Sequence, residues 1–436
     1  MQFNLRNLAH QDVWRLAGPM ILSNLTIPLL GLVDTAVMGH MTEAWYLGAV
    51  ALGALIFSFI YWGFGFLRMG TTGLTAQAFG REDGNELRSI MARAILLAVG
   101  FSFVLLLTQS LLRDLSFYIL EASNEVEVAA GIYFDIRIWS TPATLINYVF
   151  IGWFLGMQNA RAPLYLLLLT NLTNIILDLF FVFVLDMGVA GVALATVLAE
   201  YTGLTLALLL TYQQLKHHTG RWQRQAIFCL KHFREMLVLN QNIFIRTLCL
   251  IFSFAFFTAQ GAKHGDIILA ANAVLMNFQT FMAYGLDGFA HAAEALVGKA
   301  VGQKNRHAFR QAVYTAGFWS LIIAMLFTFI YLLFGTTIIN ALTDITEVRA
   351  TAYAFLAWLI ISPLVSVWSY LFDGIFIGAT RSAEMRNTML VSTFIFYLPA
   401  WYLFQPWGNH GLWAALLVFM IARGITMAIS FRRFKI

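Results

Sequence analysis

The stretch Thr170–Leu179, which reads TNLTNIILDL, carries polar side chains inside an apolar run that extends over residues 164–185. Asn171, Asn174 and Asp178 follow one another at spacings of three and four residues, and on a helix this spacing places all three on one face. An ionised Asp at the centre of a bilayer costs about 2.5 to 3.5 kcal/mol on insertion scales, so such a residue usually faces a cavity or a partner. The stretch therefore predicts a membrane helix with a functional polar face.

The composition of the whole chain is that of a membrane protein with many spans. Of its 436 residues, 60% are hydrophobic and only 11% are charged, and the mean hydropathy is +0.74. Soluble domains carry about 25% charged residues. Apolar stretches of about 20 residues, long enough to cross a hydrocarbon core of roughly 30 Å, recur along the chain. We predict an all-α integral membrane protein with twelve transmembrane helices, at residues 13–38, 48–73, 89–113, 126–153, 163–185, 189–215, 237–262, 267–295, 309–334, 347–378, 386–404 and 409–431.

The basic residues predict which side of the membrane each loop faces, because Lys and Arg of short loops stay cytoplasmic. With both termini in the cytoplasm, the only residues among the 27 Lys and Arg that are placed on the outer side are Arg113, Arg137, Lys263 and Arg349. The external loops carry acidic residues instead. The net charge of +5 is therefore a signal of topology, and we expect no binding to nucleic acid.

The chain divides into two halves that resemble each other. A basic amphipathic connector at residues 216–234 separates an N-terminal lobe, residues 1–215, from a C-terminal lobe, residues 235–436. The segment LGAVAL from Leu47 is similar to LAANAV from Leu269, and further pairs of segments match in the same order. Two six-helix repeats with the same orientation are related by an axis along the membrane normal, with a cavity between them. This pseudo-symmetric arrangement is typical of transporters.

Four polar residues are predicted to lie at one depth in the N-terminal lobe. They are Asp34 on the first helix, Asn174 and Asp178 on the fifth, and Thr196 on the sixth. These helices offer no Lys or Arg at that depth, so a proton, a metal cation or a cationic ligand is expected to neutralise the two acids. Their oxygens could ligate Na⁺, or the two Asp could share a proton; we expect the proton. Pro28 weakens the helix before Asp34 and is predicted to be a hinge that bends when Asp34 is protonated.

The remaining residues give little sign of other chemistry. Cys229 and Cys249 lie at or near the cytoplasmic side without metal-ligand spacing, so we expect neither a structural metal nor an organic cofactor. A membrane prenyltransferase could use Asn174 and Asp178 for magnesium, but it would need a second acidic motif, and the second half has no counterpart. We therefore expect no enzyme activity. A channel would be distinguished from a transporter by flux that does not saturate with substrate.

Five motifs along the chain carry a resemblance to a known family. They are PLLGLVDTAVMGH from Pro28, GLTAQAFGREDGNELR from Gly73, GWFLGMQNARAPL from Gly152, NLTNIILD from Asn171 and DGIFIGATRSAEMRN from Asp373. In this order they resemble the multidrug and toxic compound extrusion (MATE) transporters, and the DinF-like branch more than the NorM-like branch. The resemblance covers the whole chain.

The resemblance implies two six-helix lobes around a V-shaped cavity and cation-driven export of organic, often cationic, compounds. It implies a monomer in the bacterial cytoplasmic (inner) membrane whose partners are small organic molecules and the lipid bilayer. Carried over residue by residue, it assigns the cation site to Asp34, Asn174, Asp178 and Thr196, and the substrate cavity to Tyr133, Asn147 and Asn171. The helix from Gln241 to Ala262 contains no carboxylate, which argues against a C-lobe sodium site, although Asp373 remains a possible one.

Two alternatives stay open within the same superfamily. The first is a sodium-coupled exporter that uses the same four N-lobe residues. The second is a flippase for lipid-linked precursors, which would need intramembrane Arg or Lys to hold a pyrophosphate. We expect the cavity-lining helices to be nearly free of basic residues, and this expectation disfavours the flippase.

Overall fold

The chain folds into helices that form two compact units. The computed structural model describes residues 9–26, 44–120 and 123–434, and every regular element in these ranges is helical. One unit takes residues 22–235, and the other takes residues 236–436 together with residues 1–21. We call them the N-terminal and the C-terminal unit. The predicted end of the connector, at residue 234, lies next to the boundary between them.

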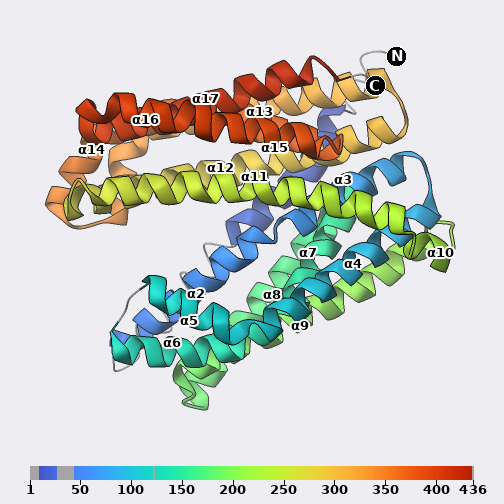
Figure 1. Ribbon diagram of the computed structural model, residues 1–436, viewed down its shortest axis with the longest axis horizontal. Helices are drawn as coiled ribbons and strands as arrows, with labels where there is room; N and C mark the ends of the chain where they lie inside the picture. The colour runs from blue at the N-terminus through green and yellow to red at the C-terminus, as the bar shows by residue number, and fades with distance from the viewer. Residues whose placement is uncertain (1–8, 27–43, 121–122, 435–436) are drawn as a thin grey trace. The chain divides into compact units, whose positions relative to one another are not determined.

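The N-terminal unit is a bundle of helices that run in pairs (Figure 1). Several of its helices are interrupted: a 3-10 turn, Ile138–Ser140, joins α6 to α7, and a π-helical segment, Phe180–Val184, extends α8. Its elements are α2 (Ala44–Gly63), α3 (Phe66–Gly80), α4 (Gly84–Leu107), α5 (Gln109–Leu120), α6 (Asn124–Arg137), α7 (Thr141–Gly156), α8 (Arg161–Leu179), α9 (Gly188–Lys216) and α10 (Arg224–Ile227).

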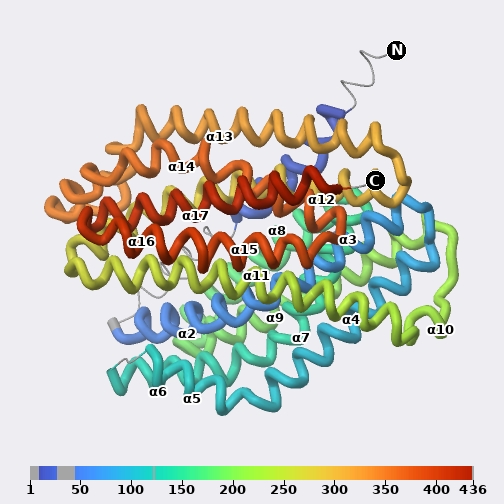
Figure 2. The backbone as a smooth tube through the Cα atoms, turned by 45° about the horizontal axis from the view of Figure 1, so that its top comes forward, coloured from blue at the N-terminus to red at the C-terminus, as the bar shows by residue number. Residues whose placement is uncertain are grey.

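The remaining helices belong to the C-terminal unit, which Figure 2 shows mainly in yellow-green to red, and the first four of them are longer than any helix of the N-terminal unit. They are α11 (Leu230–Ala262), α12 (Asp266–Gly302), α13 (Arg306–Leu342), α14 (Thr346–Gly378), α15 (Ser382–Val391), α16 (Leu398–Phe404) and α17 (Gly408–Phe431). The π-helical segment Ser392–Tyr397 continues α15 into α16. The helical residues 9–21 also pack here: the Trp14 ring lies 5.3 Å from that of Phe289 and 5.2 Å from that of Trp319.

The internal repeat is visible in the closest helix contacts of each unit. In α7, a Cβ added at Gly152 would lie 2.3 Å from the carbonyl oxygen of Arg68 on α3. In α14, a Cβ added at Gly374 would lie 2.2 Å from the carbonyl oxygen of Ala290 on α12. Both pairs are separated by 222 positions (374 − 152 and 290 − 68), the register of the sequence repeat. Glycine lets the two backbones approach where any larger residue would clash, so the two units use the same contact.

The predicted spans agree with the helices to within a few residues at most ends. Among the described residues, ten helices are long and apolar enough to cross a membrane, and the last of them, Ser382–Phe431, covers two predicted spans. The first predicted span, residues 13–38, is described only as far as residue 26. The helices α11, α12 and α13 have 33 to 37 residues and continue beyond the apolar stretches that revealed them, whereas α14 matches its predicted span to within one residue. Hydropathy detects only the apolar part of a helix, so it underestimates the length of a helix that has polar ends.

Arg88 of α4 forms hydrogen bonds with the C-terminal end of α9. Its guanidinium donates to the carbonyl oxygens of Leu215 at 3.1 Å and His218 at 2.9 Å, and also to that of Gly84 at 2.8 Å. The last carbonyls of a helix have no partner within the helix, so these bonds cap α9. Burial, together with the positive charge of Arg88, lowers the pKa of His218 in the same turn.

Candidate functional site

Asn174, Asp178 and Thr196 come together in the N-terminal unit. Asn174 and Asp178 lie one turn apart on α8, and both side chains are buried, Asp178 completely. The Asn174 amide lies 3.2 Å from the hydroxyl oxygen of Thr196 on the neighbouring helix α9. Ile176, on the side of α8 away from these two residues, is 56% exposed. The spacing of three and four residues thus turns the polar face inward, as the sequence predicts.

The orientation of the Asn174 amide decides what faces Asp178. With its oxygen toward Thr196, the amide accepts from the Thr196 hydroxyl at 3.2 Å and its nitrogen donates to Asp178 Oδ2 at 3.2 Å. This orientation satisfies both polar ends of the amide, so we adopt it. An amide N–H donor then faces the carboxylate, and a donor cannot ligate a cation.

Asp34 and Pro28 lie outside the described residues, and their assigned roles stay predictions. Asn171, which the family resemblance assigns to the substrate cavity, donates to the Thr26 hydroxyl at 2.9 Å. Thr26 lies on the described part of the first helix. Asn171 therefore joins the first helix to α8, an interhelical contact typical of Asn in membrane helices.

A second polar cluster, which the sequence analysis missed, lies one turn further along α9. Its centre is Glu200: the Asn147 amide on α7 donates to the Glu200 carboxylate at 3.0 Å and to the Glu200 carbonyl at 3.1 Å. Glu200 follows Thr196 by four residues, which places both on one face of α9. That spacing was the available signal for Glu200, because a glutamate inside an apolar helix is as costly as an aspartate.

Arg137 belongs to this cluster and does not lie in an external loop. It ends α6 within a continuous helical region, donates to the hydroxyl of Tyr133 and lies 5.1 Å from the centre of the Phe57 ring. Its positive charge acts on Glu200. Arg137 therefore lies within the candidate membrane span Asn124–Gly156, and its placement on the outer side of the membrane stays a prediction. Two of the residues assigned to the substrate cavity, Tyr133 and Asn147, thus line one charged cluster, which holds an acid and a base.

The C-terminal unit contains a different charged site. Asp373 on α14 accepts from Arg246 on α11 and from Arg423 on α17, the latter at 2.7 Å. All three side chains are buried, with at most 10% exposed. Both bonds reach the same oxygen, Oδ2, and among the described residues no donor reaches Oδ1. Two guanidinium groups thus bind the carboxylate of Asp373, which the sequence analysis named as a possible cation site.

The expectation that the cavity-lining helices are nearly free of basic residues stays a prediction, but two arginines lie within candidate membrane spans of the C-terminal unit. Arg246 lies in the middle of α11 and Arg423 in the middle of α17, and both are almost fully buried. An isolated Arg in an apolar run is a weak signal, because its partner stands elsewhere in the sequence. Here the shared partner is Asp373, which neutralises one of the two charges. Asp287 also acts electrostatically on Arg423. These arginines are thus engaged within the protein, so they give little support to a pyrophosphate site.

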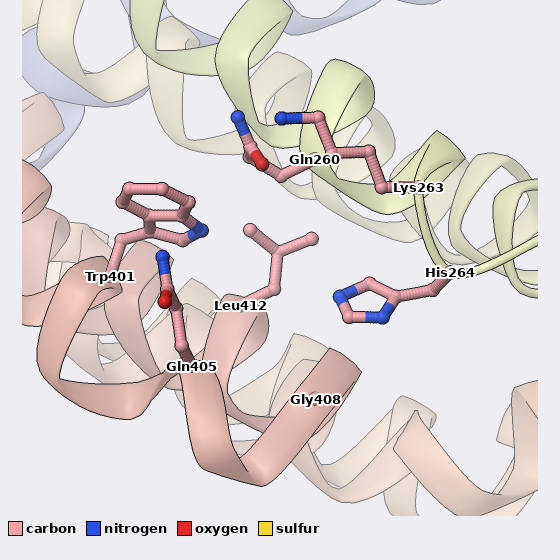
Figure 3. A pocket seen from close by; sticks show the side chains of 7 residues that line it. All are labelled: Gln260, Lys263, His264, Trp401, Gln405, Gly408 and Leu412. Atoms are coloured by element: carbon pink, nitrogen blue, oxygen red, sulfur yellow. The ribbon is translucent and has the colours of Figure 1, made fainter.

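Two pockets, one in each unit, lie at helix ends. Figure 3 shows the pocket of the C-terminal unit, about 340 Å³ in volume, between the end of α11 and the turn from α16 to α17. Its lining includes Lys263, His264 and Trp401. The pocket of the N-terminal unit, about 450 Å³, lies between α2, α6 and α9 and is lined by residues such as Tyr46 and Glu125. Neither pocket contains a residue of the predicted site.

Comparison with known proteins places the chain in a family. The model of the family MatE matches residues 19–180 and 243–403. The chain is 45% identical over 422 residues to the DNA damage-inducible protein F of Escherichia coli, covering 97% of this chain and 92% of the relative. It is 25% identical over 349 residues to a probable multidrug resistance protein NorM of Thermotoga maritima, covering 77% of this chain and 72% of that relative.

A solved structure shares the fold. The Vibrio cholerae MATE transporter VcmN in its bent form superposes with a TM-score of 0.87, covering 98% of this chain and 97% of that chain at 22% sequence identity. The family match extends over both units and includes the segments that carry Asn174, Asp178 and Asp373. The chain belongs to the MATE family of multi-pass membrane transporters, and it is a transporter and not an enzyme.

Proposed function

We propose that this transporter exports organic compounds, often cationic, in exchange for protons, and that Asp34 and Asp178 carry the coupling proton. The observation that supports the proposal is the complete burial of Asp178 beside two neutral side chains, Asn174 and Thr196. Burial disfavours the ionised form of a carboxyl, so a completely buried aspartate is suited to take up a proton. The charge that attracts a cationic substrate then disappears as the proton binds.

The same neighbours favour a proton over sodium. A metal cation needs several oxygens directed at one point. In the satisfied orientation of Asn174, an N–H group is directed at Asp178, and the amide oxygen is engaged by the Thr196 hydroxyl. Sodium binding would require this amide to turn over and give up both bonds. Sodium coupling at the same residues remains the alternative outcome of the test.

The substrate class is proposed from chemistry and from the relatives. The N-terminal unit offers a buried acid, Asp178, and aromatic side chains such as Tyr133, which suit organic cations. The Thermotoga maritima relative is named a probable multidrug resistance protein. We place the transporter in the bacterial cytoplasmic membrane with both termini inside. A reporter fused after Ile436 that registers as periplasmic would contradict this orientation.

The experiment that tests coupling is transport by proteoliposomes under separately imposed gradients. The probe is ethidium, a fluorescent organic cation, and either a proton gradient without sodium or a sodium gradient at equal pH is applied. We expect the proton gradient alone to drive ethidium movement. The variant Asp178→Asn should insert normally and lose this response, because the amide has the shape of the acid but does not titrate. Transport driven by sodium alone would overturn proton coupling.

Asp186→Asn is the matched control. Asp186 is an exposed aspartate in the turn just after α8, and its positive φ of 52° is one that Asn also adopts. The control should behave like the wild type. Equal loss in both variants would show that the assay reports damage to this helix end and not titration of Asp178.

A further inference from the structure

We propose that Glu200 is a second proton carrier, which receives the coupling proton from the level of Asp178 and passes it toward the Lys216 end of α9. The inference rests on proton coupling as proposed above and adds a residue and a direction to it. It starts from an acid for which the predicted site has no role.

The position of Glu200 fits a transfer from the first site. Thr196, which contacts Asn174, stands four residues before Glu200 on the same face of α9. One helical turn, about 5.4 Å, separates the two levels. The Thr196 hydroxyl has a single proton, which it can donate either to the Asn174 amide oxygen at 3.2 Å or to the carbonyl oxygen of Val192 in its own helix at 3.1 Å. Asp178 lies one turn from Asn174 on α8, on the side away from Glu200, so the levels of the two acids are about two helical turns, roughly 11 Å, apart, and Asn174 and Thr196 lie at the level between them.

The surroundings of Glu200 support both of its protonation states. The ionised form accepts from Asn147 at 3.0 Å and is attracted by Arg137. The neutral form suits the half-buried position between helices. The other groups that face the carboxylate are Thr144 on α7 and the phenols of Tyr61 on α2 and Tyr148 on α7. Arg137 is the one cation recorded among these neighbours in the described part of the chain. A proton carrier must be able to adopt both its ionised and its neutral form, and the neighbours of Glu200 can accommodate each of these forms.

A stripe along one face of α9 leads onward from Glu200; its next two residues, Gly203 and Ala207, carry no polar side chain, and polar side chains return at Thr211 and Gln214. One turn further, Gly203 has no side chain, and a Cβ there would lie 2.3 Å from the Thr170 hydroxyl and 3.4 Å from the Asn147 amide nitrogen. The glycine thus lets an α8 hydroxyl stand beside the amide that binds Glu200. The Thr170 hydroxyl and the Asn147 amide oxygen are buried and have no hydrogen-bond partner among the described residues. Their lone pairs are available to a proton or to a hydrated proton.

The stripe continues to the end of the helix. Thr211 is buried on the same face, and Gln214 accepts from the Asn159 amide at 3.1 Å. The positions 196, 200, 203, 207, 211 and 214 follow spacings of three and four, so they form one face of α9. Residues on the opposite side, such as Leu208 and Tyr212, are exposed. Protonated Asp178 loses its proton, the Glu200 carboxylate gains it, and Glu200 then releases it along this face, so one proton moves and no other bond changes.

The test compares Glu200→Gln with Asp178→Asn in proteoliposomes that contain a pH-sensitive dye, again with ethidium as the probe. We expect Glu200→Gln to bind ethidium with unchanged affinity and to lose proton-driven transport by about a hundredfold or more. Infrared difference spectra between acidic and alkaline pH should lose one protonated-carboxyl band in Glu200→Gln and keep the band that Asp178→Asn removes. Glu200→Asp, which keeps a titrating group one methylene shorter, should recover part of the transport.

The outcomes separate this inference from the proposed function. Wild-type protein that ignores a proton gradient would overturn proton coupling and the relay with it. Proton-driven transport that is equal in the wild type and in Glu200→Gln would overturn the relay alone. Loss of ethidium binding in Glu200→Gln with coupling intact would make Glu200 a substrate contact. Glu125→Gln, at an exposed glutamate on α6, serves as the control and should transport like the wild type.

Discussion

Replacing Asp373 by Asn should destabilise the C-terminal unit without removing a cation site. Asp373 is the carboxylate shared by Arg246 and Arg423, whose side chains are only 7% and 1% exposed. The amide keeps the size of the side chain and loses its charge. Two buried guanidinium groups would then repel each other, with no carboxylate between them.

The magnitude follows from the burial of the cluster. Removing one partner of a buried ion pair costs about 3 to 5 kcal/mol, because the remaining charge stays desolvated. A domain of about 200 residues shifts its melting temperature by about 2 to 4 °C for each kcal/mol. We therefore expect Asp373→Asn to melt roughly 6 to 20 °C below the wild type. Removing one of the two cations as well, by Arg246→Gln, should recover part of this loss, since the residues act as one cluster.

The assay is thermal unfolding of the purified protein in detergent, with and without sodium. Asp344→Asn is the control, because Asp344 pairs with Arg349 at 2.8 Å while fully exposed, and exposed pairs contribute little. It should melt like the wild type. A ligand stabilises the state that binds it, so sodium should leave every melting temperature unchanged if arginines occupy Asp373. An unchanged melting temperature in Asp373→Asn, or sodium stabilisation that this variant alone lacks, would refute the reasoning.

Three further substitutions test other contacts. Thr196→Val removes the hydroxyl at the predicted site; it should cost about 0.5 to 1.5 kcal/mol in unfolding free energy and slow proton-driven transport, as measured in proteoliposomes. Gly203→Ala forces a methyl group against an α8 hydroxyl and should cost about 1 to 3 kcal/mol, whereas Gly100→Ala, which meets nothing within 4 Å, should be neutral in the same melting assay. Arg88→Met removes the cap of α9 and should speed trypsin cleavage after Arg221, and unchanged cleavage would contradict the capping role.

Much of the fold was predictable because hydropathy reports directly on lipid exposure. The apolar stretches revealed the helices, and the repeat of 222 positions that the sequence suggests recurs in the glycine contacts of Gly152 and Gly374. The meeting of Asn174 with Thr196 followed from helical periodicity and from a common depth in the membrane. These inferences need only local rules, applied to each helix separately.

The charged clusters were not predictable in the same way. Arg246 and Asp373 are 127 residues apart in sequence, and Arg423 lies 50 residues from Asp373. Which helices bring them together depends on packing that no single helix encodes. Glu200 could have been predicted from the sequence, since it lies four residues from Thr196, the same spacing that separates Asn174 from Asp178. The π-helical segments after α8 and α15 had no signal, because hydropathy does not distinguish them from α-helix.

The most direct measurement of proton exchange at the N-terminal acids is proton release on substrate binding. Purified protein in weakly buffered, sodium-free detergent solution is mixed with ethidium, and the pH change is recorded for the wild type, Asp178→Asn and the control Asp186→Asn. We expect the wild type and the control to release protons as ethidium binds, and Asp178→Asn to release fewer or none. Ethidium binding that releases no protons from the wild type, or releases as many from Asp178→Asn, would contradict the exchange of substrate for a proton at this site.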